Sequence, residues 1–224
     1  VAILYNFPSN PTGATLTPEQ RDDLLDFARR HHLWIITDEV YDRIVYDVEH
    51  VSFLGTGYNR TLMINSFSKT FAMTGWRIGY ICSPNIEAMS QIIKMQYYIT
   101  ACSNDAMQYA VLTAFDEAST YPEEMAKEFQ ARRDLICSRL NSMPGVSCHI
   151  PNGAFYVFPK VEVPGMNSQE LAIELLKGGV LSSPGSAFGE SGEGHLRFAY
   201  TVSREDISLG MDKVESVLKR LRGD

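Results

Sequence analysis

The amino-acid sequence predicts an α/β protein with a mostly parallel sheet, followed by a smaller α+β domain. Short apolar runs alternate with amphipathic segments in the first third of the 224-residue chain, and this alternation is typical of parallel strands joined by helices. Helical periodicity dominates from residue 85, and short strands return near the C-terminus. We therefore expect a first domain over residues 1–115 and a second over 116–224, the second beginning with a long linking helix.

The elements of the first domain follow from apolar runs and from helix-start signals. Apolar runs predict strands over residues 1–6, 33–38, 61–66 and 78–82, and "NPTG" at residues 10–13 predicts a turn. Thr17 and Gln20 have the spacing of a capping box, with Pro18 at the first helical position, so a helix is expected to begin there. Its apolar face is expected to hold Leu24, Leu25, Phe27 and Ala28.

The remaining elements are mostly helical. Periodicity predicts helices over 86–98, 105–115 and 121–143, and the last has acids early and arginines later, as the helix dipole favours. Pro144 and Gly145 end it. A helix over 168–178 and a final helix from Ser203, where "SRED" has capping-box spacing, complete the α part. The expected strands are residues 146–150, 154–158 and 195–200.

Composition argues against several classes of partner. The net charge of −7 and the pI near 5.3 oppose general affinity for nucleic acid or anionic membranes. No apolar run approaches the roughly 20 residues that a membrane-spanning helix needs. The pair His31-His32 lacks metal-ligand spacing, so no metal site is expected. The cysteines, Cys82, Cys102, Cys137 and Cys148, form no C-x-x-C, which favours reduced thiols in a cytoplasmic protein.

Polar side chains follow or precede the expected strands where ligands collect in open α/β sheets. They are Asn10, Asp38, Tyr41, Ser66, Ser68, Lys69 and Arg77. Serine hydroxyls with an arginine fork suit a phosphate. A lysine between Phe67 and Phe71 is expected to have a lowered pKa and to act as an amine nucleophile. A carboxylate keeps a heteroaromatic nitrogen protonated. One ligand with a phosphate, an aldehyde and a pyridine nitrogen is pyridoxal 5′-phosphate.

Five segments resemble the class I/II aminotransferases, the pyridoxal-phosphate enzymes of fold type I. They are "NPTG" (10–13), "DEVY" (38–41), "SFSKTFAMTGWRIGY" (66–80), "PNGAFYVFP" (151–159), and "PGSAFG" with "LRFAY" (184–200), in the family's order. The resemblance implies a homodimeric enzyme that moves an amino group from an L-amino acid to a 2-oxo acid by a ping-pong mechanism. Aspartate or broad specificity is favoured.

The resemblance also implies a role for each candidate residue. Lys69 would bond covalently to the cofactor aldehyde and later carry protons, Asp38 would bind the ring nitrogen, and Tyr41 would bind the ring oxygen together with Asn10. The phosphate would be held by Ser66, Ser68 and Arg77. The substrate's α-carboxylate would be bound by Arg197, with Asn10 beside it.

Taken singly, most of these residues have an ordinary structural explanation. Asp38 would cap a helix, and Tyr41 would pack in a core. Asn10 would be a turn residue, the serines would end a strand, and Arg77 would form a weak surface ion pair. Arg197 would point to solvent. The joint pattern favours the ligand, because all of these side chains suit one molecule.

The chain opens without methionine, inside an apolar run, as either a processed terminus or a fragment would. We favour a fragment that lacks the N-terminal part of the family's large domain. That part would supply a small-residue phosphate loop and an aromatic residue stacked on the cofactor ring. We therefore expect the chain alone to bind the cofactor weakly and to have little or no activity. Two alternatives remain: a β-lyase or cyclopropane-forming synthase of the same fold, and an aminotransferase-like domain of a transcription regulator.

Overall fold

The computed structural model describes residues 1–223, which form two compact units. Unit 1 holds residues 1–9 and 15–126, and unit 2 holds residues 10–14 together with the chain from Lys127 onward. The division expected after residue 115 stays a prediction about domains. No helix among residues 1–223 is long and apolar enough to cross a membrane.

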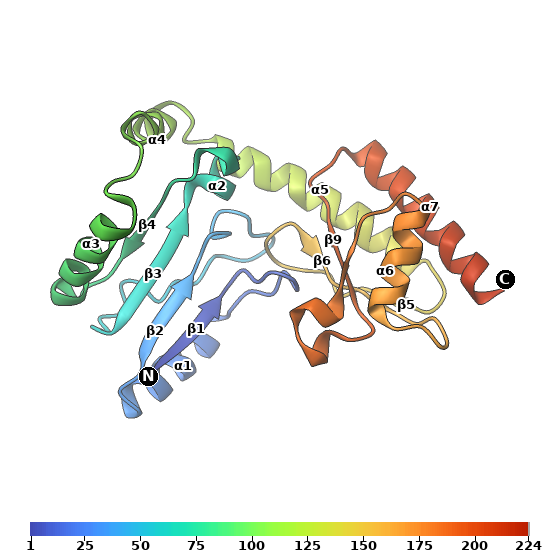
Figure 1. The fold of residues 1–224 in the computed structure, drawn as a ribbon, viewed down its shortest axis with the longest axis horizontal. Helices are drawn as coiled ribbons and strands as arrows, with labels where there is room; N and C mark the ends of the chain where they lie inside the picture. The colour runs from blue at the N-terminus through green and yellow to red at the C-terminus, as the bar shows by residue number, and fades with distance from the viewer. Residues whose placement is uncertain (224) are drawn as a thin grey trace. The chain divides into compact units, whose positions relative to one another are not determined.

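Unit 1 is built on a four-stranded sheet in the order β1-β2-β3-β4, and the strands lie side by side in Figure 1. Strands β1 (Ala2–Asn6), β2 (Trp34–Asp38) and β3 (Thr61–Ser66) are parallel, whereas β4 (Gly79–Cys82) runs antiparallel to β3. All four strands occur where the apolar runs predict them, and the mostly parallel sheet is confirmed.

Helix α1 (Pro18–Arg30) begins with the predicted capping box. Gln20 N donates to Thr17 Oγ1 at 3.2 Å, and Thr17 N donates to Gln20 Oε1 at 3.0 Å. Leu25 and Ala28 are buried against Ile35 of β2. Phe27, expected on the same face, is instead 43% exposed and packs on the His31 ring.

The other helices of unit 1 follow β3 and β4. A single turn, α2 (Phe67–Thr70), and a 3₁₀ turn, η1 (Thr74–Trp76), separate β3 from β4, and neither is predicted from the sequence. Helices α3 (Ile86–Thr100) and α4 (Asp105–Glu117) confirm the periodicity. Helix α5 (Tyr121–Asn141) begins in unit 1 and ends in unit 2.

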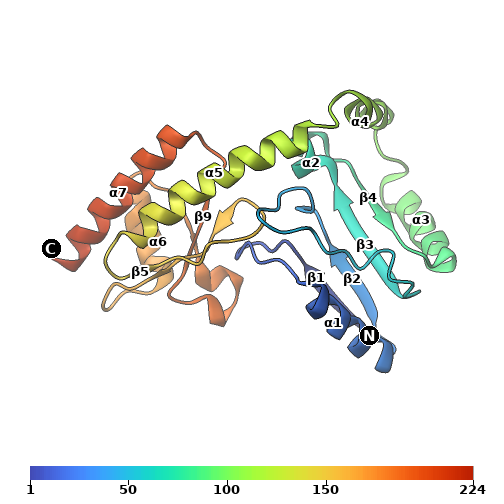
Figure 2. The ribbon, with the colours of Figure 1, turned by 180° about the vertical axis from the view of Figure 1, so that it is seen from behind.

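Unit 2 contains two small antiparallel sheets, most of α5 and two helices of its own, and Figure 2 shows the chain from behind. Strands β5 (Val146–Ser147) and β7 (Lys160–Val161) pair, and β6 (Tyr156–Val157), β9 (Leu196–Ala199) and β8 (Ser183–Pro184) form the second sheet in that order. Short 3₁₀ turns, η2 (Gly185–Phe188) and η3 (Glu190–Gly192), follow β8. Helices α6 (Ser168–Lys177) and α7 (Arg204–Arg222) occur near the predicted positions.

Two strands of unit 2 are shorter than the sequence predicts, and each has a local cause. The strand expected over 146–150 ends at Ser147, because the Asn141 side chain binds both the N–H and the C=O of Cys148. The strand expected over 154–158 begins only at Tyr156, because Ala154 has a positive φ of 58°. The Asn141 amide thus takes the backbone groups of Cys148 that strand pairing would use, and the left-handed backbone at Ala154 interrupts the extended conformation.

The capping box predicted at Ser203 is formed only in part. Ser203 Oγ accepts from Asp206 N at 3.1 Å, as an N-cap should, but the hydroxyl also donates to Asp206 Oδ2 at 2.9 Å. The acid at the third position therefore bonds the capping hydroxyl, in place of the reciprocal backbone bond made by Gln20 at α1. Aspartate is one methylene shorter than the glutamate or glutamine of a full box.

A glycine fixes how residues 10–14 pack in unit 2. Gly13 has φ +67° and its carbonyl accepts from Gly153 N at 2.9 Å. A Cβ on Gly13 would lie 2.4 Å from Pro151 Cβ and 2.7 Å from Gly153 O. The segment that carries Asn10 therefore depends on a residue without a side chain.

Gly13→Ala is expected to destabilise the chain through both backbone strain and this clash, at about 2–4 kcal/mol. Gly57→Ala is the matched control, because Gly57 has a similar φ of +73° with nothing within 4 Å of an added Cβ; it should cost only about 1–2 kcal/mol. Urea unfolding of the two variants measures the difference. Equal losses would contradict the close packing of Gly13.

Candidate active site

The register of the parallel strands brings candidate residues of unit 1 to one edge of the sheet. Asn6, Asp38 and Ile64 lie in one row across β1, β2 and β3, and Ser66 ends β3 two residues further on. Asp38 Oδ1 accepts from Val40 N at 3.2 Å, so its carboxylate also caps the turn after β2. Asp38 therefore stands at the carboxyl edge, where α/β sheets bind ligands.

A buried carboxylate beside Asp38 was missed by the sequence analysis. Glu39 is 3% exposed and accepts from Thr37 Oγ1 at 3.2 Å and Ser52 Oγ at 3.0 Å, and it lies 2.8 Å from His50 Nε2. These bonds fasten the loop holding His50 and Ser52 to the end of β2, next to Asp38 and the buried Tyr41. The only sequence signal was the place of Glu39 within "DEVY".

Ser66 and Ser68 lie together at the start of α2. Ser66 Oγ accepts from Ser68 N at 3.1 Å, donates to Ile78 O at 3.0 Å, and lies 2.9 Å from Ser68 Oγ. Ser66 thus ends β3, as its ordinary structural explanation holds, and it is also the N-cap of the turn. The same geometry places two hydroxyls side by side, immediately before Lys69.

Lys69 lies on α2, half-buried, and its pKa is lowered. Burial is the larger cause, and the positive charge of Arg77 adds to it. Arg77 lies just after η1 with a left-handed φ of 55°, and its Nη1 donates to Thr74 O at 2.9 Å. The positive charges of Lys69 and Arg77 act on each other, and an anionic ligand would be attracted to both.

The structure brings Asn10 and Arg197 of unit 2 together, although they are far apart in sequence. Arg197 Nη1 donates to Asn10 Oδ1 at 2.8 Å, and Nη2 donates to Ser183 Oγ at 3.0 Å. The guanidinium lies 4.6 Å from the ring centre of Tyr156 and 5.0 Å from that of Phe188. Arg197 is therefore held in place on β9 rather than extended into solvent.

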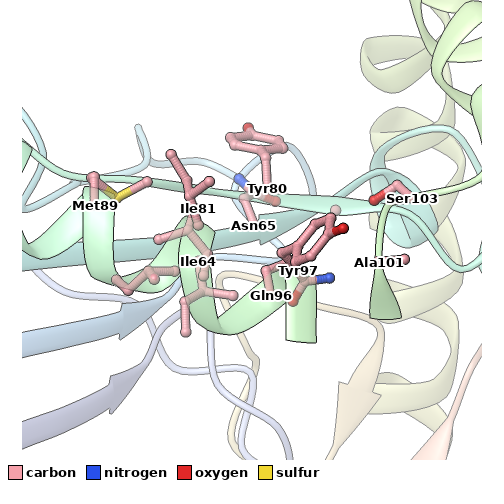
Figure 3. A pocket seen from close by; sticks show the side chains of 12 residues that line it. Ile64, Asn65, Tyr80, Ile81, Met89, Gln96, Tyr97, Ala101 and Ser103 are labelled. Carbon is pink, nitrogen blue, oxygen red and sulfur yellow. The ribbon is translucent and has the colours of Figure 1, made fainter. Parts of the chain in front are cut away.

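Two of the cavities in unit 1 are lined mostly by residues other than the candidates. The first, about 500 Å³, is drawn in Figure 3, where side chains of β3, β4 and α3 line an apolar hollow that contains no predicted site residue. The second, about 310 Å³, includes Ser66 beside Asp42 and a group of aromatic rings. No cluster of metal-ligating side chains occurs among residues 1–223.

The sequence profile described as "Aminotransferase class I and II" matches residues 1–214. The chain belongs to this family. The expected fold and family membership are therefore confirmed, and enzymes of this family depend on pyridoxal 5′-phosphate.

Named relatives and solved structures agree with this assignment. The chain is 41% identical to aromatic-amino-acid aminotransferase 2 of Thermococcus litoralis and 40% identical to aspartate aminotransferase of Pyrococcus abyssi, with 97% of the chain and 57% of each relative covered. An aromatic aminotransferase structure from Pyrococcus horikoshii matches with a TM-score of 0.92 and 40% identity, over 98% of this chain and 60% of that one. The chain thus spans a little over half the length of these relatives.

The family's cofactor fits the donor set of unit 1. Ser66 and Ser68 offer adjacent hydroxyls, and Arg77 offers a guanidinium, as a phosphate requires. Lys69 offers an amine whose pKa is lowered, as bonding to an aldehyde requires. Asp38 offers a carboxylate at the same sheet edge for the ring nitrogen.

The pH dependence of Lys69 reactivity tests this electrostatic description. Labelling with an amine reagent at a series of pH values, followed by peptide mass analysis, should give Lys69 an inflection below the ordinary lysine value of 10.5. Arg77→Gln should move the inflection upward, because the neighbouring positive charge is removed. The pKa of Lys69 is lower in the folded chain, so folding should become more favourable as pH rises between the folded and unfolded values. An inflection unchanged by Arg77→Gln would contradict the assigned cause.

Proposed function

We propose that the protein carrying this chain is an aminotransferase, which moves an amino group from an L-amino acid to a 2-oxo acid in two half-reactions. The observation that carries the proposal is the environment of Lys69. This lysine is half-buried, it follows two adjacent serine hydroxyls, and burial and the positive charge of Arg77 lower its pKa. Membership of the family supplies the reaction class.

Each unit 1 residue has a task in this proposal. Bound pyridoxal 5′-phosphate would supply an electron-withdrawing ring that makes the substrate's α-hydrogen acidic. Lys69 Nζ would hold the cofactor through its aldehyde carbon and would be the base that takes the proton from the substrate's α-carbon. Asp38 would keep the ring nitrogen protonated, Tyr41 would bind the ring oxygen, and the phosphate would be held by Ser66, Ser68 and Arg77.

The proposed unit 2 residues bind substrate. Arg197 would take the α-carboxylate with its planar fork, and Asn10 would orient that fork and offer its amide N–H to the cofactor ring oxygen. The stacking of the guanidinium on Tyr156 and its bond to Ser183 support this, because an arginine held on several sides loses less entropy when it binds a carboxylate.

For substrate, we propose aspartate or a broad range of amino acids. The relatives carry names that refer to aromatic amino acids and to aspartate, a Pyrococcus furiosus structure is described as an alanine aminotransferase, and a Thermus thermophilus aspartate aminotransferase structure is described with maleate. A dicarboxylate or an apolar side chain is therefore compatible with this framework. We further propose a homodimer in the cytoplasm, where four free thiols are stable.

The experiment is a single half-reaction with the 224-residue chain at high concentration, excess cofactor and L-aspartate. We expect at most slow formation of one 2-oxo acid per chain, well below the rate of the Pyrococcus abyssi relative measured in parallel. Lys69→Ala should fall to the rate of free cofactor. A rate above that of free cofactor that Lys69→Ala leaves unchanged would contradict the proposal, and so would release of ammonia in place of transfer of the amino group to the cofactor.

Arg197→Lys tests the proposed substrate-binding role of Arg197. Replacing a bidentate fork by a single ammonium should weaken affinity for L-aspartate or maleate by about tenfold, roughly 1.4 kcal/mol. Arg220→Lys is the matched control, because Arg220 lies on α7 in an exposed ion pair with Glu174. Calorimetric titration with maleate measures affinity alone, because maleate has no amino group to transfer. The titration therefore separates weaker binding from slower reaction.

A further inference from the structure

Two buried cysteines of unit 2 lie in contact. Cys137 is on α5 and Cys148 follows β5, and their Sγ atoms are 3.9 Å apart. Their exposed fractions are only 2% and 6%. A disulfide needs a separation of about 2.05 Å, so the two sulfurs have to approach by roughly 2 Å.

We propose that Cys137 and Cys148 are a redox-active dithiol, which a small two-electron oxidant such as a peroxide converts to an intramolecular disulfide. Neither residue belongs to the candidate active site. Neither lies in any of the five segments that resemble the family, and their wide spacing in the sequence predicts only reduced thiols.

The local structure holds the two sulfurs together. Asn141 lies four residues after Cys137 and therefore on the same face of α5. Its side chain accepts from Cys148 N at 2.8 Å and donates to Cys148 O at 2.9 Å. The amide thus fixes the Cys148 backbone against the helix face that carries Cys137. These two hydrogen bonds hold the two sulfurs in contact.

The surroundings assign different roles to the two thiols. The pKa of Cys137 is lowered, chiefly by its hydrogen bond with Cys148 and further by the charge of Arg133, while burial acts in the opposite direction. The pKa of Cys148 is raised, chiefly by the bond with Cys137 and also by burial. Cys137 is therefore the attacking thiolate, and Cys148 is the thiol that resolves the product.

The chemistry balances with hydrogen peroxide as the oxidant. The Cys137 thiolate attacks one peroxide oxygen, the O–O bond breaks, and the leaving hydroxide takes a proton to become water. Cys148 Sγ then attacks the Cys137 sulfenic sulfur, forming the S–S bond and releasing a second water as its thiol proton joins the departing hydroxyl. Two thiols lose two hydrogens, and one peroxide becomes two waters.

The disulfide would join α5 to the loop after β5, which contacts the segment of residues 10–14. Shortly after Cys148, Pro151 O accepts from Arg133 Nη1 at 3.2 Å, and Gly153 N donates to Gly13 O at 2.9 Å. The oxidised chain is therefore expected to hold the packing around Gly13 more rigidly and to have a higher melting temperature than the reduced chain.

Peptide mapping of the 224-residue chain tests the proposal directly. The chain is reduced, exposed to hydrogen peroxide, blocked with N-ethylmaleimide and digested without reductant. Trypsin cuts after Arg133, Arg139 and Lys160, so the two cysteines fall in separate peptides, 134–139 and 140–160. We expect these peptides to appear linked, two hydrogens lighter than their sum, and to separate on reduction.

Cysteine variants test which thiols take part in the link. Cys102, which is exposed, is the matched control: Cys102→Ala should keep the 134–139 to 140–160 link. Cys148→Ser, which keeps a hydroxyl donor beside Cys137, should leave a Cys137 sulfenic acid that dimedone traps. If the unaltered chain gives no such link while Cys102 is oxidised, or if Cys137 links to Cys82 or Cys102 as readily as to Cys148, the proposal is wrong. The unaltered chain decides this alone, even if a variant fails to fold.

Discussion

The parallel register of β1, β2 and β3 is the constraint on which the candidate site depends. Because parallel strands end at the same edge, the pairing of Asn6 with Asp38 and of Asp38 with Ile64 sets the carboxylate level with the end of β3. Ser66, Ser68 and Lys69 follow at once in the single turn of α2. A shift of one residue between β2 and β3 would turn Asp38 to the opposite face of the sheet and separate the carboxylate from the amine.

The two units contribute different chemistry. Unit 1 gathers hydroxyls, an amine and a guanidinium, with a buried Glu39 network bracing the backbone beside Asp38. Unit 2 holds one guanidinium by an amide, a hydroxyl and two aromatic rings. The first set suits a phosphate and an aldehyde, and the second suits a carboxylate.

Local patterns were predictable from the sequence, and contacts between distant residues were not. The Thr17 capping box and the four strands of unit 1 depend on neighbours within a few residues, so their patterns are visible in the chain. The short β5, the bonds that Glu39 makes with His50 and Ser52, and the bond between Arg197 and Asn10 join residues 7 to 187 positions apart. The roles of the candidate residues stay predictions, since they came from a family resemblance and from the chemistry of a joint pattern.

The central claim is that Lys69 is the lysine that bonds to the cofactor. Incubation with pyridoxal 5′-phosphate, reduction with borohydride and tryptic mapping test it most directly, even where binding is weak. Trypsin cuts after Arg60, Lys69 and Arg77, and it does not cut after a modified lysine, so label on Lys69 should yield the peptide 61–77. That peptide carrying the cofactor mass is the predicted result. Label spread over exposed lysines such as Lys94, with peptide 61–69 unmodified, would contradict the account.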